Sequence, residues 1–554
     1  LMAIKIPKEY GGLGMSQTNY MRVLSAISKH CGSVAATLSA HQSIGAPQPL
    51  KLFGTEEQRQ KYLPMFGKGA ISAFALTEPG VGSDPANMAT TAEKDENGDW
   101  IINGTKLWCT NGVIADVIVV MAKTPSIMKH GREVNQISAF IVETDTPGFE
   151  ILHRCRFMGI KAIENGLLRF TNVKVPAENL IWGEGKGLRL ALTTLNDGRL
   201  SIPAIAAEAT LEVSDFMHQW GKSREQWGKL IGEHEAGADK LAQIAAGGFA
   251  MKAFSDYCAA LSDMGDRDLR MEAASAKLYN TELCWELMDT ALQFRGGRGF
   301  ETSTSLVERG EAAFPMERAL RDARINRIVE GTTDIMHLFL AREALDSHLR
   351  LAGGLFKRGA TVGDKIKVLA KAGLFYARWY PKLWLGGLFK SYGQFDPQLR
   401  KWVKWTEKRT RKLARTLFHQ MALQGPKLEM RQLILARLVN AGTELAVMAL
   451  VASRVQTEIN AGNRANVNKA VYWLTSRSQV VEDLFRGVTK NTDALARTLA
   501  REQLDASTLL PEPAPVDLQP QPRERGIDIT SGRQAKRLWE GGSVPTDDAP
   551  VKSA

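Results

Sequence analysis

A block of β-type sequence between two helical blocks constrains the fold more than any other feature of this chain. From about residue 71 to residue 181, β-rich runs (WIING, DVIVVMA, ISAFIVE and LLRFTNVKV) alternate with the turn signals ENGD, TNG and TDTPG. Apolar residues recur at helical spacing from Met15 to Ala70 and again from Gly187 to about Leu349. The sequence has no βαβ alternation and no GxGxxG after a strand, so a Rossmann domain has little support. We therefore predict a mainly α chain with a central antiparallel β domain.

The composition of the 554 residues excludes several other classes of protein. With 44% hydrophobic and 24% charged residues, the chain resembles a globular protein with several cores. Its five cysteines form no CxxC pair, which favours reduced thiols over a disulfide framework or a zinc site. No strongly apolar run approaches the ~20 residues that cross a bilayer, so no transmembrane helix is predicted. The chain opens at Leu1 without a methionine, and we expect it to be truncated at its start.

The net charge of +11 is concentrated in residues 351–420, which hold 16 Lys and Arg against 3 Asp and Glu. Aromatic residues are interspersed with these cations: Trp379, Tyr380, Trp384, Phe389, Trp402 and Trp405. Cations beside aromatic residues favour contact with an anionic membrane surface. A solvated charged face over an aromatic core is the alternative. Residues 511–554 begin with a Pro-rich pattern and are predicted to be a disordered tail.

Three polar, glycine-rich clusters are the candidates for chemistry, because the sequence lacks HExxH, GxSxG, P-loop and Cys/His metal patterns. In ALTEPGVGSD, residues 75–84, backbone N–H groups could face an anion or a flat ring, although a plain loop has the same composition. NGTKLWCTNG, residues 103–112, contains a hairpin signal followed by Trp108, which could equally be a core residue. In RDARINRIVEGTTD, residues 321–334, Glu330 precedes a glycine and a helix start, where a carboxylate can also be purely structural.

With REQWGKLI around Arg224 and QFRGGRGF near residue 296, these clusters resemble the acyl-CoA dehydrogenase family from Ile6 to about Leu345. The very-long-chain branch is the most similar, because SAHQSIG, KLFGTEEQRQKYLP, MGIKA and LNDGR look like that branch. That branch also carries a C-terminal extension. The resemblance implies an N-terminal helical domain (1–72), a central β domain (73–183), a four-helix bundle (184–349) and a basic, aromatic helical extension (350–510) before the tail (511–554).

The resemblance also implies that FAD is the cofactor, and the family's motifs assign its contacts. Trp108 would lie against the isoalloxazine ring, and Thr110 would hydrogen-bond near the reactive ring nitrogen. Arg224 would contact the FAD pyrophosphate of a neighbouring subunit, which suits a forked cation and implies a homodimer. The other predicted cofactor residues are Phe74, Ala75, Leu76, Thr77, Ser83, Gln226, Gln293, Gly296, Gly297, Thr332 and Asp334.

Glu330 matches the family's catalytic base. Removing the proton α to a thioester requires a base close to that carbon, and burial raises the pKa of a carboxyl group toward the working range. Some relatives carry the base at the position of Gly198, where glycine cannot serve. The family activates the α-proton by hydrogen-bonding the thioester oxygen to a backbone N–H at the glutamate and to a ribityl hydroxyl. The predicted substrate residues are Ser83, Asn196, Arg199, Gly331, Ala35 and Ser39.

Small side chains at Ala35 and Ser39, four residues apart on one helix face, would leave a deep acyl channel, in which each buried CH2 is worth ~0.8 kcal/mol. Close helix packing would require the same small residues. The resemblance implies FAD-dependent dehydrogenation of long- or very-long-chain acyl-CoA to trans-2-enoyl-CoA in fatty acid β-oxidation, with electrons passed to electron-transfer flavoprotein. The location would be the bacterial cytoplasm or the mitochondrial matrix, peripheral at the inner membrane if the extension binds lipid.

Three alternatives remain open. An oxygen-using oxidase would share these motifs, and so would an assembly scaffold with vestigial activity, like the family member that helps to build respiratory complex I. A nucleic-acid-associated homologue would place the basic stretch on phosphates, with a steep salt dependence; nucleic acid is the less favoured partner. Two residues depart from the family pattern: Cys109, expected to be a buried spectator thiol, and Val329, which stands where an aromatic residue is common.

Overall fold

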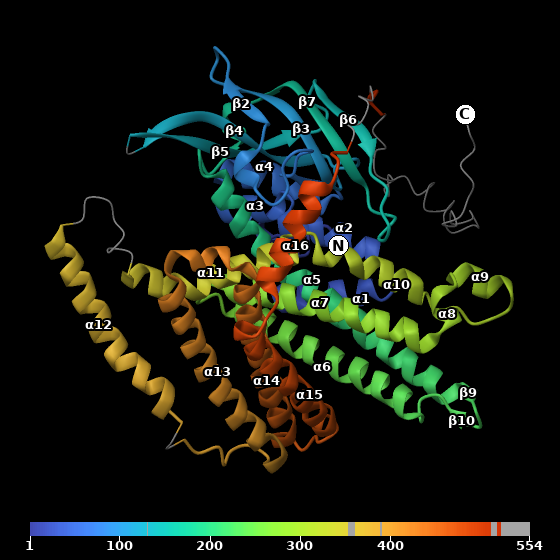
Figure 1. Ribbon diagram of the computed structural model, residues 1–554. Helices are drawn as coiled ribbons and strands as arrows, with labels where there is room; N and C mark the ends of the chain where they lie inside the picture. The colour runs from blue at the N-terminus through green and yellow to red at the C-terminus, as the bar shows by residue number, and fades with distance from the viewer. Residues whose placement is uncertain (130, 353–360, 388–389, 511–517, 522–554) are drawn as a thin grey trace. The chain divides into compact units, whose positions relative to one another are not determined.

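The computed structural model describes residues 1–129, 131–352, 361–387, 390–510 and 518–521 (Figure 1). The chain divides into two compact units. Of the described residues, those within Leu1–Ser201, Leu292–Asp322 and Asp517–Ala554 form unit 1, and those within Ile202–Ala291 and Ala323–Val516 form unit 2. The β domain therefore belongs to unit 1, whereas the C-terminal extension shares unit 2 with the long helices that precede it.

Four helices precede the sheet in unit 1: α1 (Gln17–Ser28), α2 (Gly32–Ser39), α3 (Pro47–Phe53) and α4 (Glu56–Gly67). Local sequence determines where they start. The Ser16 hydroxyl accepts a hydrogen bond from the Asn19 backbone N–H (3.3 Å), and Thr55 and Gln58 form a reciprocal capping box. The apolar faces of α3 and α4 are buried in one core with strands β4 and β5.

The eight strands described in unit 1 form one sheet in the order β6-β7-β3-β2-β4-β5-β8, with β1 paired to β4. They are β1 (Ser72–Ala75), β2 (Thr91–Lys94), β3 (Trp100–Thr110), β4 (Val117–Lys129), β5 (Arg132–Glu143), β6 (Phe149–Arg154), β7 (Asn165–Val175) and β8 (Leu180–Ile181). Most pairs are antiparallel, as predicted. The β1–β4 pair and the short contact of Thr91 with Lys123 are parallel.

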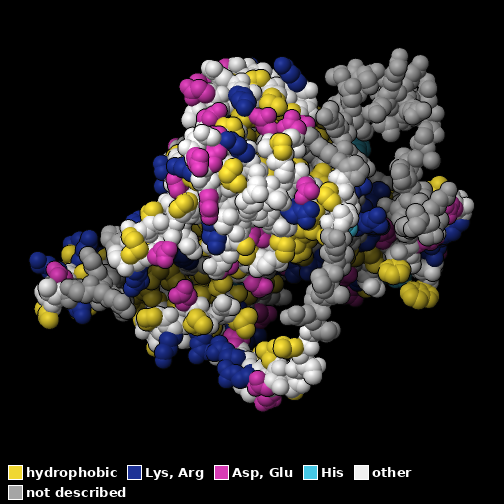
Figure 2. Space-filling view, turned by 90° about the horizontal axis from the view of Figure 1, so that it is seen from above, with side chains coloured by type: hydrophobic (Ala, Val, Ile, Leu, Met, Phe, Trp, Pro, Cys, Tyr) yellow, Lys and Arg dark blue, Asp and Glu magenta, His cyan; other side chains and the backbone are white. Residues whose placement is uncertain are grey.

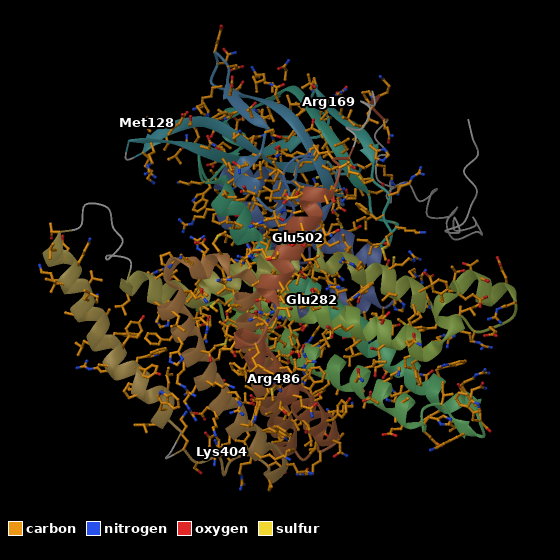
Figure 3. All side chains as sticks on the ribbon, in the orientation of Figure 1. Met128, Arg169, Glu282, Lys404, Arg486 and Glu502 are labelled. Atoms are coloured by element: carbon orange, nitrogen blue, oxygen red, sulfur yellow. The ribbon has the colours of Figure 1, made fainter. Side chains whose placement is uncertain are left out.

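Strand β4 is buried on both faces, which explains its unbroken apolar run. Val117 and Val119 belong to the core that includes α3 and α4, whereas Ile118 and Val120 belong to the opposite core around Trp100. Beyond these cores the β4–β5 hairpin continues to an exposed end, where Met128 is 71% exposed (Figure 3).

The hairpin predicted at Asn103–Gly104 is wrong. Both residues lie inside β3, at a register shift against β7 between Ile102 and Gly104. Gly104 has φ +152°, and a Cβ atom there would lie 2.5 Å from the Thr90 hydroxyl oxygen. The glycine therefore allows two backbones to approach each other, a requirement that has the same sequence signature as a tight turn.

The remaining helices make up most of unit 2. Helix α5 (Gly187–Ser223) begins in unit 1, and α8 (Gly297–Phe300), α9 (Ser303–Glu308) and most of α10 (Met316–Arg324) belong to unit 1. Unit 2 contains α6 (Glu235–Met264), most of α7 (Arg270–Arg295), α11 (Thr333–Ala352), α12 (Val362–Leu385), α13 (Pro397–Gln424), α14 (Gln432–Asn460), α15 (Val467–Thr489) and α16 (Asp493–Ala506).

Helix α14 is long and apolar enough to cross a membrane, with a mean hydropathy of 1.6 over its most apolar window. The sequence predicts no transmembrane helix here, because Arg437 and Glu444 interrupt the apolar run. Within unit 2 this helix packs against α6, α11, α13 and α15, and 56% of the window is buried. Its Glu444 side chain forms an ion pair with Arg477 of α15. The apolarity of α14 is therefore accounted for by its place in the core of unit 2.

The predicted tail, residues 511–554, lies outside the described residues except for 518–521. In that short piece the Gln521 backbone N–H donates to the Ile151 carbonyl oxygen of β6 (2.7 Å).

Candidate functional site

Strands β1 and β3 bring two of the predicted cofactor segments together in unit 1. The Leu107 N–H donates to the Thr77 carbonyl oxygen (2.8 Å), and the Cys109 thiol lies 3.6 Å from the Phe74 carbonyl oxygen. Residues 74–77 and Trp108–Thr110 are therefore neighbours. The expectation of a buried thiol is confirmed, since Cys109 is 2% exposed and burial raises its pKa to about 12.

Trp108 is displayed outward by an irregularity in β3. The register with β7 shifts between Lys106 and Cys109, and Trp108 has φ +54°, which is rare for a large side chain. As a result its indole is 57% exposed, although every other residue of the strand is buried or partly buried. An aromatic ring presented in this way can support a flat ligand, which a core tryptophan cannot do.

Thr110 lies beside a buried amide. Asn165 of β7 donates from Nδ2 to the Thr110 hydroxyl oxygen (3.1 Å), so the Thr110 proton is available to donate elsewhere. The Asn165 Oδ1 atom is also buried, and it has no hydrogen-bond donor among the residues that the structure describes. A polar group therefore fits at this position.

The loop after β1 is held by a buried ion pair. Lys106 Nζ lies 2.7 Å from Glu78 Oε1, and their side chains are 0% and 3% exposed. Glu78 also accepts hydrogen bonds from the backbone N–H groups of Ala89 and Thr90. Although burial raises the pKa of Glu78, the hydrogen bonds from Lys106, Thr90 and Ala89 bring it below its usual value. The start of residues 78–90 is thus tied to β3.

The glycines at the predicted FAD positions leave room for a ligand. A Cβ atom at Gly80, Gly82, Gly296 or Gly297 would meet no heavy atom within 4 Å. Ser83, in the same loop, is exposed. With the outward Trp108, this open backbone fits a flavin nucleotide. Gln293, Gly296 and Gly297 lie at the C-terminal end of α7, and among the described residues none of them hydrogen-bonds to β1 or β3.

The predicted acyl-channel residues lie on α2, where Ala35 and Ser39 are buried, at 0% and 6% exposure. Asn111, which follows β3, donates to the carbonyl oxygens of Thr37 (3.1 Å) and Ser72 (3.3 Å). This side chain joins α2 to the strands that carry the predicted flavin residues.

The predicted substrate residues of α5 contact each other. Arg199 is 5% exposed, and its Nη1 donates to Asn196 Oδ1 (3.2 Å). Between them, Asp197 forms an ion pair with Lys5 (2.7 Å). This contact ties the start of the chain to the segment that contains Gly198, the alternative base position.

In unit 2, Glu330 occupies a turn between a 3-10 turn (Ile325–Arg327) and α11. Glu330 has φ +55° and Gly331 has φ +98°, so two successive residues adopt the left-handed region. A Cβ atom at Gly331 would lie 2.4 Å from Met336 Cε. Thr332 caps α11 by accepting from the Ile335 N–H (3.4 Å), and Asp334 is exposed in its first turn. The turn presents a carboxylate on a strained backbone.

Helix α7 holds this turn from one side. Lys277 is 0% exposed, and its Nζ donates to the Gly331 carbonyl oxygen (2.7 Å). Glu282 forms an ion pair with Arg327 (2.6 Å) and accepts a hydrogen bond from the Thr333 hydroxyl. Figure 3 labels Glu282 on this helix.

Arg224 and Gln226 lie at a hairpin of unit 2 formed by β9 (Glu225–Gln226) and β10 (Lys229–Leu230). The two turn residues, Trp227 and Gly228, have φ +53° and +70°, as a two-residue hairpin turn requires. Trp227 is 94% exposed. Exposure of this kind fits a surface that another molecule covers.

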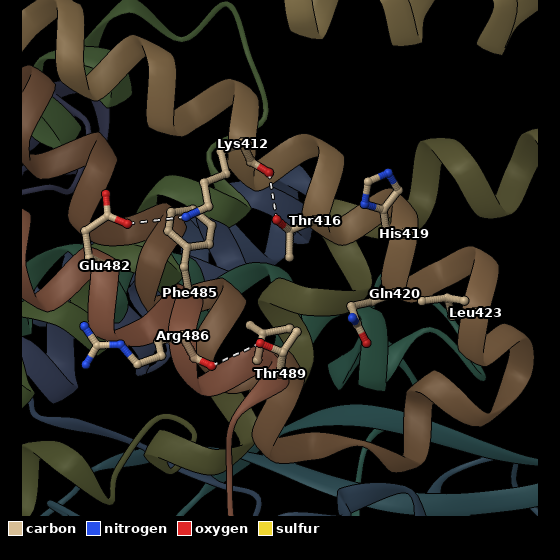
Figure 4. Close-up of a pocket in the computed structure, with 10 residues that line it drawn as sticks. Lys412, Thr416, His419, Gln420, Leu423, Glu482, Phe485, Arg486 and Thr489 are labelled. Carbon is tan, nitrogen blue, oxygen red and sulfur yellow. Dashed lines mark hydrogen bonds and ion pairs between the residues drawn. The ribbon is translucent and has the colours of Figure 1, made fainter.

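A hollow of about 530 Å³ lies between α13 and α15 (Figure 4). It is lined by Lys412, Thr416, His419, Gln420, Leu423, Glu482, Phe485, Arg486, Val488 and Thr489. Lys412 Nζ lies 3.3 Å from Glu482 and 4.2 Å from the centre of the Phe485 ring, so its charge is paired. None of the predicted site residues lines this hollow, which belongs to the extension. Among the described residues, no group of three or more His, Cys, Asp and Glu could hold a metal ion.

Family models cover most of the helix, sheet, helix region. The N-terminal domain of acyl-CoA dehydrogenase matches residues 1–70, the middle domain matches 73–173 and the C-terminal domain matches 185–345. The chain belongs to the acyl-CoA dehydrogenase family. It is a flavin-dependent oxidoreductase that uses FAD, as the sequence predicted.

Among its relatives, the probable acyl-CoA dehydrogenase FadE10 of Mycobacterium tuberculosis is 46% identical over 509 residues, covering 91% of this chain and 78% of that protein. The mitochondrial very long-chain specific acyl-CoA dehydrogenase of Homo sapiens is 32% identical, covering 83% and 69%. An acyl-CoA dehydrogenase from Bacillus anthracis, solved with FAD, superimposes with a TM-score of 0.72 at 26% identity, covering 97% of this chain and 87% of that one. The predicted fold class and family are confirmed.

Sequence reasoning missed five residues that support the site: Glu78, Lys106, Asn111, Lys277 and Glu282. Three of them lie inside the motifs already quoted. Lys277 and Glu282 lie on α7, in a part of the helix that none of the quoted motifs includes. A lysine within the apolar run AASAKLYN was the available signal, because a charge on a buried helix face requires a partner.

Proposed function

We propose that this chain dehydrogenates long- or very-long-chain acyl-CoA to trans-2-enoyl-CoA, with Glu330 as the base. The main support for the proposal is the turn at Glu330. The backbone of this glutamate is in the left-handed region, and residues of α7 bind the turn from one side. Strain that the surrounding structure maintains is typical of functional positions.

The chemistry requires the α-proton to pass to a carboxylate while the β-hydrogen leaves with its electron pair. Glu330 accepts the proton, and the backbone N–H groups of the Glu330–Gly331 turn donate to the thioester oxygen as negative charge develops there. Arg199 and Asn196 would contact the substrate. Bound FAD supplies the two-electron acceptor for the β-hydrogen.

The residues that would hold FAD are those that the family motifs assign. Phe74, Ala75, Leu76, Thr77 and Ser83 would line the flavin, Trp108 would support one face of the ring, and the Thr110 hydroxyl would donate to it. The other residues assigned to FAD are Gln293, Gly296, Gly297, Thr332 and Asp334. Arg224 and Gln226 would reach the pyrophosphate of FAD bound by a second copy, so we propose a homodimer.

Anaerobic flavin bleaching with a series of acyl-CoAs tests the reaction. Glu330→Gln should slow bleaching by about 10²–10⁴-fold, the usual contribution of a general base. The matched control is Glu308→Gln, an exposed carboxylate on α9, which should bleach at the parental rate. Parental rates in Glu330→Gln would refute the assignment of the base. Absence of bleaching with every chain length would favour the scaffold alternative.

The proposed chain length rests on Ala35 and Ser39 and on the relative described as very long-chain specific. If these side chains form the floor of a deep channel, Ala35→Leu should lower kcat/KM for the longest acyl chains and spare short ones. A uniform loss would mean that the small residues serve only helix packing.

We propose electron-transfer flavoprotein as the acceptor and the bacterial cytoplasm as the location, in line with the mycobacterial relative. Reoxidation of the bleached enzyme separates this from an oxidase. Electron-transfer flavoprotein should restore the yellow colour much faster than air. The opposite order would favour the oxidase.

We further propose that α12 contacts an anionic membrane surface. Val362, Ile366 and Leu369 are 76%, 59% and 57% exposed along one side of this helix. Four cations, Lys367, Lys371, Arg378 and Lys382, share another side because they are spaced by four, seven and four residues. At the edge of Figure 2 where α12 begins, dark blue and yellow side chains are mixed.

Some aromatic side chains of the segment 351–420 support the interpretation as an aromatic core, and others support contact with a membrane surface. Trp379 packs against Phe418 and His348, and Tyr380 hydrogen-bonds to His419, as an aromatic core would require. Trp384 is 59% exposed, with the Arg415 guanidinium 3.9 Å from its ring centre. Phe389 lies outside the described residues, and Trp402 and Trp405 pack on each other.

Flotation with vesicles tests α12. The chain should float with vesicles of 30% phosphatidylserine, and Lys367→Glu/Lys371→Glu should reduce flotation several-fold. Lys404→Glu/Lys408→Glu on α13 makes the same charge change and should not (Figure 3 labels Lys404). Binding to duplex DNA at matched salt that exceeds vesicle binding would instead support the nucleic-acid alternative.

A further inference from the structure

Lys277 is an unusual residue for its position. A fully buried ammonium group is unfavourable unless it is hydrogen-bonded, and an uncharged side chain would fill the same space at less cost. On the same helix, Ala274 and Leu278 pack with Met336 and Leu340 of α11 in an apolar cluster. The polar end of Lys277 reaches the Gly331 carbonyl oxygen, directly after Glu330.

Glu282 makes the complementary contacts. It lies five residues after Lys277 on α7, and its two carboxylate oxygens contact Arg327 on one side of the turn and Thr333 on the other. Residues 327–333 are therefore fixed at their middle by Lys277 and at both ends by Glu282. The segment held in this way contains the two left-handed residues, Glu330 and Gly331.

We infer that Lys277 and Glu282 are positioning residues for proton abstraction by Glu330, an inference that rests on the proposed function. The hydrogen bond from Lys277 fixes the direction of the Gly331 carbonyl, and so fixes the peptide planes on either side of the base. The carboxylate of Glu330 and the N–H groups of the turn then face the substrate as one rigid group.

The experiment uses the FAD-loaded chain, three variants of α7 and Glu330→Gln. In Lys277→Met, which keeps the length of the side chain and removes its charge and donor, kcat should fall about 10- to 100-fold with KM little changed. Glu282→Gln should show a smaller loss of kcat. Thr281→Val is the matched control, because Thr281 is a buried residue of α7. Among the described residues its hydroxyl donates only within the helix, to the carbonyl oxygens of Lys277 (2.8 Å) and Leu278 (3.4 Å).

Hydrogen exchange measured by mass spectrometry gives a readout that does not depend on activity. Amides of residues 327–336 should exchange faster in Lys277→Met and Glu282→Gln than in the parent or in Thr281→Val. If Lys277→Met does not fold, the partly exposed Glu282→Gln decides the question by the same two measurements.

The outcomes separate the two proposals. If the parent bleaches and Glu330→Gln does not, the proposed function stands. In that case, parental kcat and parental exchange in both α7 variants would overturn the inference. If Glu330→Gln bleaches at the parental rate, the assigned base is wrong, and faster exchange in the α7 variants would show only that they hold the turn.

Discussion

The buried pair of Lys106 and Glu78 allows a quantitative prediction. In Lys106→Met the side chain keeps its length but loses its charge, so the Glu78 carboxylate stays buried without its cation. Removing one partner of a buried ion pair costs about 3–5 kcal/mol. The structure places this pair at that level because the side chains are 0% and 3% exposed and their charged atoms lie 2.7 Å apart. For a unit of this size about 2–4 °C is lost per kcal/mol, so the melting temperature should fall by about 10 °C.

Release of FAD, followed by flavin fluorescence during heating, is the assay, because the pair holds the loop that contains Gly80 and Gly82. The control is Lys174→Met, which removes an exposed cation of the same sheet, 2.8 Å from Asp95. Exposed pairs contribute at most about 1 kcal/mol. The double variant Glu78→Gln/Lys106→Met should recover much of the loss. A Lys106→Met chain as stable as Lys174→Met, or a double variant worse than the single one, would refute the reasoning.

Three further predictions follow from buried groups. Burial lowers the pKa of His41 from 6.5 to about 4, so below pH 6.5 the unfolded chain binds a proton that the folded chain does not. Unit 1 should therefore be about 2 kcal/mol less stable at pH 5 than at pH 7. In His41→Gln the free energy of unfolding should depend less on pH. Gly331→Ala should lower kcat strongly and the melting temperature only slightly. Its Cβ atom would collide with Met336 and its φ of +98° is strained for alanine, so the adjacent base is displaced. An unchanged kcat would contradict this. Arg477→Met should destabilise unit 2 by about 3–5 kcal/mol in thermal unfolding, since it leaves the 5% exposed Glu444 carboxylate without its cation.

Much of the fold could be predicted because it depends on local patterns. Alternating and continuous apolar runs identified the strands, and helical spacing identified the region from Gly187 to about Leu349, which contains α6 and α7. The Asn103–Gly104 hairpin failed because a glycine that permits close backbone approach cannot be distinguished locally from one that permits a turn. The parallel pairing of β1 with β4 also escaped prediction, since pairing between distant segments has no local signature.

The candidate site divides in the same way. Trp108, Thr110 and Glu330 could be predicted from the sequence, because each lies in a motif of consecutive residues that is typical of the family. The outward turn of Trp108, the amide beside Thr110 and the left-handed backbone at Glu330 emerged only from the structure.

By itself, the sequence determined the family, the cofactor and the identity of the candidate base, because these depend on which chemical groups are present and on their spacing along the chain. Only the tertiary structure decided what holds those groups. Lys106 meets Glu78 across 28 residues, and Lys277 meets Gly331 across 54. Contacts between residues so far apart in the sequence are determined by how helices and strands pack. A buried charge is stable only with a partner, and the packing decides which residue is close enough to be that partner.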